Sequence, residues 1–67
     1  MRLLFLNANT GDEIGRANVP DKKARELVRM QWFSACIGLT SRQMDTWGTG
    51  NGMPLMATPS YDSGKEG

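Results

Sequence analysis

A single cysteine and the absence of histidine limit how this 67-residue chain can hold a fold together. Cys36 has no second cysteine with which to form an intrachain disulfide, and one thiolate among scattered carboxylates is not the ligand set that zinc favours. A domain of this size buries only about 60% of its unfolded surface, so regular packing or self-association has to supplement its core. We therefore expect one compact domain over residues 1–57 that needs no metal and no cofactor.

The same cysteine and the first residues of the chain indicate a compartment. Cys36 lies in an apolar run, which is typical of a buried thiol in a reducing environment. The apolar stretch at 3–6 is too short for the core of a signal peptide and far too short to span a membrane. We expect a cytoplasmic protein with no membrane partner.

Residues 2–19 predict a β-hairpin. The run 2–6 is apolar, and residues 14–19 alternate loosely between two faces. Between them, Asn7 can accept a hydrogen bond from the backbone two residues on, and Gly11 can take a positive φ without a steric penalty. These positions favour a type I turn closed by a glycine bulge.

The chain after the hairpin predicts a helix. Pro20 ends the extended segment, and Asp21 is a favourable N-cap whose carboxylate suits the positive end of the helix dipole. From Lys22 onward the apolar residues recur at helical spacing and leave the charged residues on the opposite face. The residues that fall on one face of this helix are Ala24, Leu27, Val28 and Gln31.

The second half of this helix is expected to differ from the first. Residues 30–37 are apolar almost all round, and we expect them to continue the helix until Gly38 ends it in the left-handed conformation. A helix without a polar face is buried on all sides or covered by a partner. Because so small a chain has little else to cover it, this apolar half-helix predicts self-association or obligate binding of a partner.

A second short helix is predicted over 41–47. Thr40 and Gln43 have the spacing of a capping box, in which each side chain bonds the other residue's backbone N–H. Leu39 and Met44 have the spacing of a hydrophobic staple across the same helix start. These signals are independent of one another, and they point to the same first turn.

The composition changes at Gly48, which ends the second helix. Residues 48–52 form a glycine-rich loop, 53–56 are an apolar patch that folds back on the core, and 58–67 form a flexible tail. The fold class expected is therefore α+β, with an N-terminal β-hairpin, two helices (ββαα) and an irregular C-terminus.

No residue pattern supports catalysis. Cys36 has no histidine to activate it, and the serines have no base near them in sequence. Asp12 and Glu13 fall on the hairpin tip, whereas general acid–base chemistry needs carboxylates held in a cleft. We expect a protein that is not an enzyme.

Residues 34–54 carry the most specific pattern in the chain. Ile37-Gly38-Leu39-Thr40 is followed by Met44, Trp47, Gly50 and Pro54, and this resembles the helix-turn-helix of the Cro/C1-repressor family. It is similar, less closely, to the excisionase and MerR-like families. The resemblance implies a recognition helix anchored by Met44 and Trp47. The positions that it offers to the major groove are Ser41, Arg42, Gln43, Asp45 and Thr46.

This resemblance covers about a third of the chain. It departs from the family pattern because a hairpin replaces the first helix, the preceding helix is expected to be one long element, and Asp45 brings a negative charge towards DNA. An ordinary αα-corner uses the same glycine and the same capping box for local reasons, and it is the structural alternative.

Two functions follow as hypotheses. The first is a small DNA-binding transcription regulator of the kind encoded by phages and plasmids, a homodimer through the apolar half-helix. Arg42 would pair with a guanine edge and Gln43 with an adenine edge. The residues expected at DNA are Ser41, Arg42, Gln43 and Thr46 at the bases and Lys22, Lys23, Arg25 and Arg29 at the phosphates.

The second hypothesis is a phage-type protein–protein interaction module that inhibits or adapts a larger host protein. A net charge of +1, from eight basic and seven acidic residues, favours it over a binder of phosphates. So does the content of methionine and aromatic residues, which are enriched in interfaces, although a methionine-rich core explains them equally well. The residues expected at the interface are Met30, Trp32, Phe33, Met53 and Met56.

Overall fold

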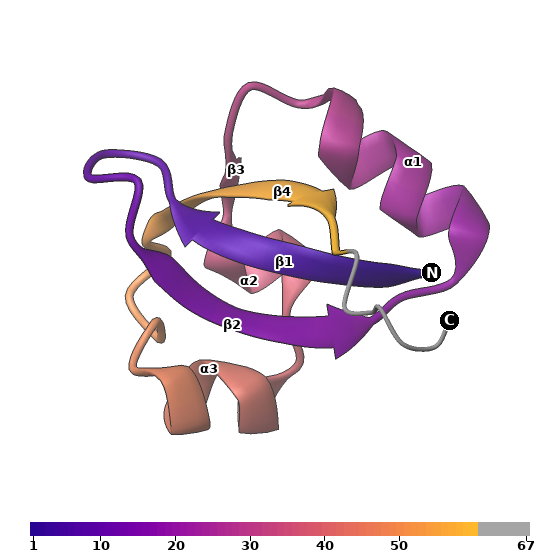
Figure 1. Cartoon of the computed structure of the whole chain (residues 1–67). Coiled ribbons are helices and arrows are strands. Elements are labelled where there is room, and N and C mark those ends of the chain that lie inside the picture. Colours follow the sequence, from indigo (N-terminus) through magenta and orange to yellow (C-terminus); the bar gives the residue numbers. More distant parts are fainter. Residues whose placement is uncertain (61–67) are drawn as a thin grey trace.

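The computed structural model describes residues 1–60 and confirms the α+β class (Figure 1). Its elements follow the order ββαβααβ, so the predicted ββαα order lacked two strands and one helix. The strands are β1 (Arg2–Asn7), β2 (Glu13–Asn18), β3 (Phe33–Ser34) and β4 (Pro54–Pro59), and the helices are α1 (Asp21–Arg29), α2 (Ala35–Gly38) and α3 (Ser41–Trp47).

The predicted hairpin is confirmed, and its turn forms for the predicted reasons. The Asn7 Oδ1 accepts hydrogen bonds from the backbone N–H groups of Asn9 (2.8 Å) and Thr10 (3.2 Å). Gly11 has a φ of 81° and donates its N–H to the carbonyl of Asn7 at 2.7 Å. A bulge shifts the register between Phe5 and Leu6, where β1 pairs with β2.

The sheet is antiparallel throughout, with strand order β2-β1-β4-β3. Residues 54–56 of the predicted apolar patch at 53–56 form the start of β4, a central strand that lies between β1 and β3. This strand runs through Pro59, and the N–H of Ser60 donates to the carbonyl of Arg2 at 3.0 Å. Residues 58–60 therefore belong to the folded domain, and the rest of the predicted tail, 61–67, lies outside the described residues.

One face of the sheet carries the core. Leu3, Phe5 and Leu55 are fully buried there, and the period of two along a strand sends their neighbours Leu4, Leu6 and Met56 to the other face, where they are half-buried. The helices pack on the core face through buried residues of α1 and α2 and half-buried residues of α3. Those residues are Ala24, Leu27, Ala35, Met44 and Trp47.

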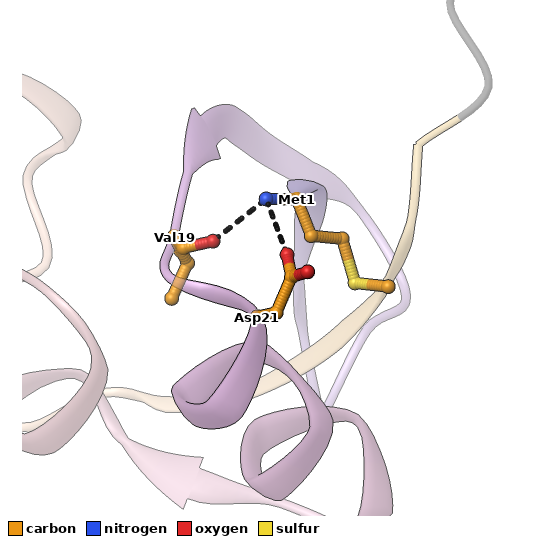
Figure 2. A network of polar contacts seen from close by, with 3 residues as sticks. All are labelled: Met1, Val19 and Asp21. Carbon is orange, nitrogen blue, oxygen red and sulfur yellow. Dashed lines mark hydrogen bonds and ion pairs between the residues drawn. The ribbon is translucent and has the colours of Figure 1, made fainter.

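The start of α1 differs from the prediction. Pro20 occupies the N-cap position, and no side chain within residues 1–60 caps this end. Asp21 instead lies in the first turn, where its Oδ1 accepts from the N-terminal ammonium of Met1 at 3.2 Å (Figure 2). The ammonium also donates to the carbonyl of Val19 at 2.8 Å, so the chain start is tied to the loop that enters α1.

The predicted apolar half-helix over 30–37 is wrong. α1 ends at Arg29, and Met30 has already turned to an extended ψ of 141°. Phe33 pairs with Leu55 of β4 as the edge strand β3, and α2 then makes a single turn. Its side chains do not form one helical face but alternate between core and solvent: Phe33 is 2% exposed, whereas Trp32 is 60% exposed.

Two predictions within this segment are corrected with it. Gly38 is the last residue of α2 and does not adopt a positive φ. A glycine stands there because a Cβ would lie 2.3 Å from Cε2 of the buried Phe33 ring. Cys36 is exposed instead of buried, since its one-turn helix turns Ala35 to the core. The start of α2 is capped by Ser34, whose Oγ accepts from the N–H of Cys36 at 3.2 Å.

Candidate interaction surfaces

The predicted start of α3 is confirmed in both directions of the capping box. The N–H of Gln43 donates to Thr40 Oγ1 at 3.2 Å, and the N–H of Thr40 donates to Gln43 Oε1 at 3.0 Å. Gly48 ends the helix, as predicted, and its φ is 71°. Leu39 is 7% exposed and Met44 packs against the same core, so both staple residues face inward.

The outer side of α3 presents a mixed set of polar groups. Of the predicted major-groove positions, Gln43 is half-buried, and its Oε1 is engaged by both the N–H and the hydroxyl of Thr40. An adenine edge would compete with this cap for the amide oxygen. The positions that remain exposed are Ser41, Arg42, Asp45 and Thr46.

The inner side of α3 holds the helix on the core. The Trp47 ring centroid lies 5.7 Å from that of Phe5, in a tilted arrangement. Its indole also covers Gly15 of β2, where a Cβ would stand 2.6 Å from Cε2 of Trp47. Met44 and Trp47 therefore occupy the inward positions that the helix-turn-helix resemblance implies, although the helix before the turn, α2, has only four residues.

The basic residues predicted at phosphates divide between two places on α1. Lys23 lines a groove of about 200 Å³ together with Thr40 and Gln43 of the α3 start. Arg25 and Arg29 line a different hollow, beside Met1 and Pro59. These residues and Lys22 are all exposed, and the structure does not gather them around α3.

The predicted interface residues also separate. Trp32 and Met30 are exposed, at 60% and 42%, while Phe33 is part of the core. Met53 is half-buried and packs against the core, where its Sδ accepts from Asn7 Nδ2 at 3.7 Å. Met56 is half-buried on the opposite face of the sheet, paired with Leu6 of β1.

Trp32 stands at the rim of a groove of about 410 Å³, which we call the Trp32 groove. The hairpin tip forms one wall and the segment before β3 the other, with β4 between them: the N–H of Ala8 donates to the carbonyl of Pro54 at 3.0 Å, and Pro54 pairs with Ser34 of β3. Pro54 and Met56 share one face of β4, on which Met56 pairs with Leu6 of β1. Within the described part of the chain the lining residues, none of them charged, are Ala8, Asn9, Gln31, Trp32, Gly52 and Pro54.

Sequence reasoning singled out Trp32 but missed the other residues of the groove. Ala8, Asn9 and Gly52 are small or polar turn residues with no pattern that marks a surface. They converge because β4 inserts between β1 and β3, a pairing of segments about 50 positions apart. A local pattern carries no information on such a pairing.

Other chemistry is sparse in the described part of the chain. No three His, Cys, Asp or Glu residues among 1–60 lie close enough to hold a metal ion. The hydroxyl of Thr49 is buried, and within 1–60 it has no hydrogen-bond partner. We assign this hydroxyl no role.

Comparisons with protein-family models, with curated proteins and with solved structures find no match for this chain. Among residues 1–60 no helix is long and apolar enough to cross a membrane. The functional argument therefore depends on the surfaces themselves.

Proposed function

We propose that this chain is a non-enzymatic protein-interaction module that binds a larger partner protein through the Trp32 groove. The observation that carries the proposal is the indole of Trp32, which is 60% exposed at the edge of a hollow. Leaving so large an apolar ring in water forgoes much of the burial free energy that a core position would supply.

The surroundings of Trp32 support a protein partner over a nucleic acid. Tryptophan is among the residues that contribute most to binding at protein interfaces. No charged side chain of residues 1–60 lines the groove, whereas binding to DNA or RNA draws its affinity from cations placed at phosphates. Gln31 and Asn9 supply amide groups at the rim, suited to hydrogen bonds with a partner's backbone.

Trp32→Ala tests this proposal, with Ile37→Ala as its matched control. Both side chains are apolar and exposed, at 60% and 56%, but Ile37 is not part of the groove. A partner is first captured from a nuclease-treated lysate, and its affinity for each purified variant is then measured. We expect Trp32→Ala to weaken binding by about 2 kcal/mol or more, with the melting temperature nearly unchanged.

The control separates this surface from general stickiness. Ile37→Ala is expected to bind the partner as the unchanged protein does. Equal losses in the two variants, or a captured partner indifferent to Trp32→Ala, would contradict the proposal.

A second copy of the chain is one possible partner. The route expected through a half-helix at 30–37 no longer exists, but Met30 and Trp32 remain exposed. Sedimentation over a range of concentrations distinguishes a homodimer from binding to another protein.

We place the interaction in the cytoplasm, because an exposed unpaired thiol such as Cys36 persists best in a reducing compartment.

DNA reading through α3 is the second candidate function. It is favoured by Arg42, which is exposed on a helix whose anchors Met44 and Trp47 face inward, with Lys23 at the groove beside the helix start. It ranks second because Gln43 is occupied by the cap and Arg25 and Arg29 line a separate hollow.

A salt titration tests this candidate. A DNA-binding regulator loses affinity for duplex DNA steeply as salt rises, and Arg42→Ala would cost about 1–3 kcal/mol of specific binding. Absence of binding at low salt would exclude DNA reading.

A further inference from the structure

A second hollow, at the far end of the sheet from the Trp32 groove, combines an apolar floor with two cations. It has a volume of about 270 Å³ and is lined by Met1, Arg25, Val28, Arg29 and Pro59. We call it the arginine hollow. In the β1–β4 ladder Leu3 pairs with Pro59, whereas Asn7 pairs with Leu55 beside the other groove, so the two hollows lie at opposite ends of the same strands.

The N-terminal residue contributes an apolar wall to this hollow. The Met1 ammonium is held by the carbonyl of Val19 and by Asp21 Oδ1, at 2.8 and 3.2 Å. Figure 2 shows the Met1 side chain extending to the side opposite Val19. Asp21 is engaged by the Met1 ammonium, and no carboxylate of residues 1–60 lines the hollow.

The two arginines are spaced by one helical turn on the flank of α1 next to Val28. Both are exposed, and no ion pair joins either of them to an acidic residue among residues 1–60. Like charges at this spacing destabilise a helix slightly. Arg25 and Arg29 thus present two guanidinium groups beside the half-buried Val28 and the ring of Pro59, and neither is held in an ion pair with Asp21, Glu26 or another acidic residue among residues 1–60.

We propose that the arginine hollow binds an acidic peptide segment of a partner protein. An apolar side chain of the segment packs on Val28 and Pro59, and its flanking carboxylates pair with Arg25 and Arg29. Guanidinium groups suit this role because they form paired hydrogen bonds with carboxylates. Duplex DNA has the negative charge that complements the two arginines, but it has no aliphatic side chain to place on the floor of the hollow. This inference is independent of the Trp32 groove.

The experiment uses the full chain and a fluorescein-labelled peptide in which a central leucine is flanked on both sides by glutamates. Two control peptides replace either the leucine with serine or the glutamates with glutamine. Fluorescence anisotropy measures affinity, and amide chemical shifts locate the bound peptide. We expect the first peptide to bind at least about tenfold more tightly than either control, with shifts centred on Val28 and Arg29.

A matched pair of double variants tests which cations act. Arg25→Gln with Arg29→Gln is expected to lower affinity for the peptide about tenfold or more. Lys22→Gln with Lys23→Gln removes the same charge from the same helix, and it is expected to change affinity by less than about threefold. Equal losses in the two pairs would show unspecific attraction and overturn the proposal.

Three further results would also overturn it. The first is equal binding of the peptide that has serine in place of leucine, since the apolar floor would then be unused. The second is displacement of the peptide by duplex DNA through Arg25 and Arg29. The third is a gain of about tenfold in affinity in the variant Asp62→Asn with Glu66→Gln, which would assign the hollow to the chain's own last residues.

Discussion

The helices α1 and α3 are of similar length but are held in place by different means. α1 buries Ala24 and Leu27 in the core, and within residues 1–60 no side chain caps its start. None of the seven residues of α3 is fully buried, yet the helix has a reciprocal cap at Thr40 and a left-handed glycine at its end. Packing against the sheet therefore stabilises α1, whereas α3 depends more on bonds within its own ends.

The difference explains which helix the sequence describes well. The start and end of α3 match the prediction residue for residue, because a capping box and a terminal glycine act within a few positions. The end of α1 was misplaced by eight residues, since its apolar pattern continues into a segment that the sheet captures. A helix stabilised by its ends is visible in local sequence, and one stabilised by packing is visible only in part.

The largest effect is expected from Leu27→Ala in α1. Leu27 is 1% exposed, and removing its side chain leaves a cavity between α1 and the sheet. We expect a loss of about 2–5 kcal/mol in the free energy of unfolding, measured by chemical denaturation. Met44→Ala in α3 is the comparison, and it is expected to cost less because Met44 is half-buried. A larger cost at Met44 would reverse the contrast between the two helices.

The next effect concerns the turn between the helices. Gly38→Ala places a Cβ 2.3 Å from the Phe33 ring, and we expect this overpacking to cost about 1–3 kcal/mol. Gly50→Ala is the control, because no heavy atom of the described chain lies within 4 Å of its added Cβ and its φ is not positive. If both variants melt alike, the Phe33 contact does not explain the glycine. Replacing the Phe33 ring by a smaller aliphatic side chain, Phe33→Leu, is expected to reduce the cost of Gly38→Ala.

A smaller loss is expected from the cap of α3. Thr40→Ala removes the hydroxyl that accepts from the N–H of Gln43, and it should destabilise the protein by about 1 kcal/mol. Thr40→Ser keeps the oxygen and serves as the matched control in the same thermal melts. Should Thr40→Ala leave the melting temperature unchanged, α3 would be held by Met44 and Trp47 alone.

The smallest effect is expected at Arg42, the exposed second residue of α3. It forms no ion pair with residues 1–60, so Arg42→Ala should change stability by no more than about 0.5 kcal/mol. Thermal melts and DNA titrations of the same variant separate structure from function. Lost stability without any DNA binding would make Arg42 a structural residue and would exclude the regulator hypothesis.

The sequence predicted individual residues of the candidate surfaces, but it did not predict which residues lie next to one another on them. Trp32 and Met56 were expected at a protein interface and Arg25 and Arg29 at DNA phosphates, from residue type alone. Their neighbours in space, such as Ala8 and Pro59, carry no such signal. Each hollow is assembled at one end of the β1–β4 ladder, and the pairing of those strands is what brings its walls together.

The sequence by itself determined the hairpin turn at Asn7–Gly11 and the bounds of α3, because these depend on hydrogen bonds and φ angles within a few residues. Only the tertiary structure decided the path of residues 30–38 and the place of β4. Phe33 leaves the helical path to pair with Leu55 at the sheet edge and fill the core, and Gly38 accommodates its ring. The reason is physical: burial of a large side chain stabilises contacts between distant segments, and no local propensity encodes where those segments meet.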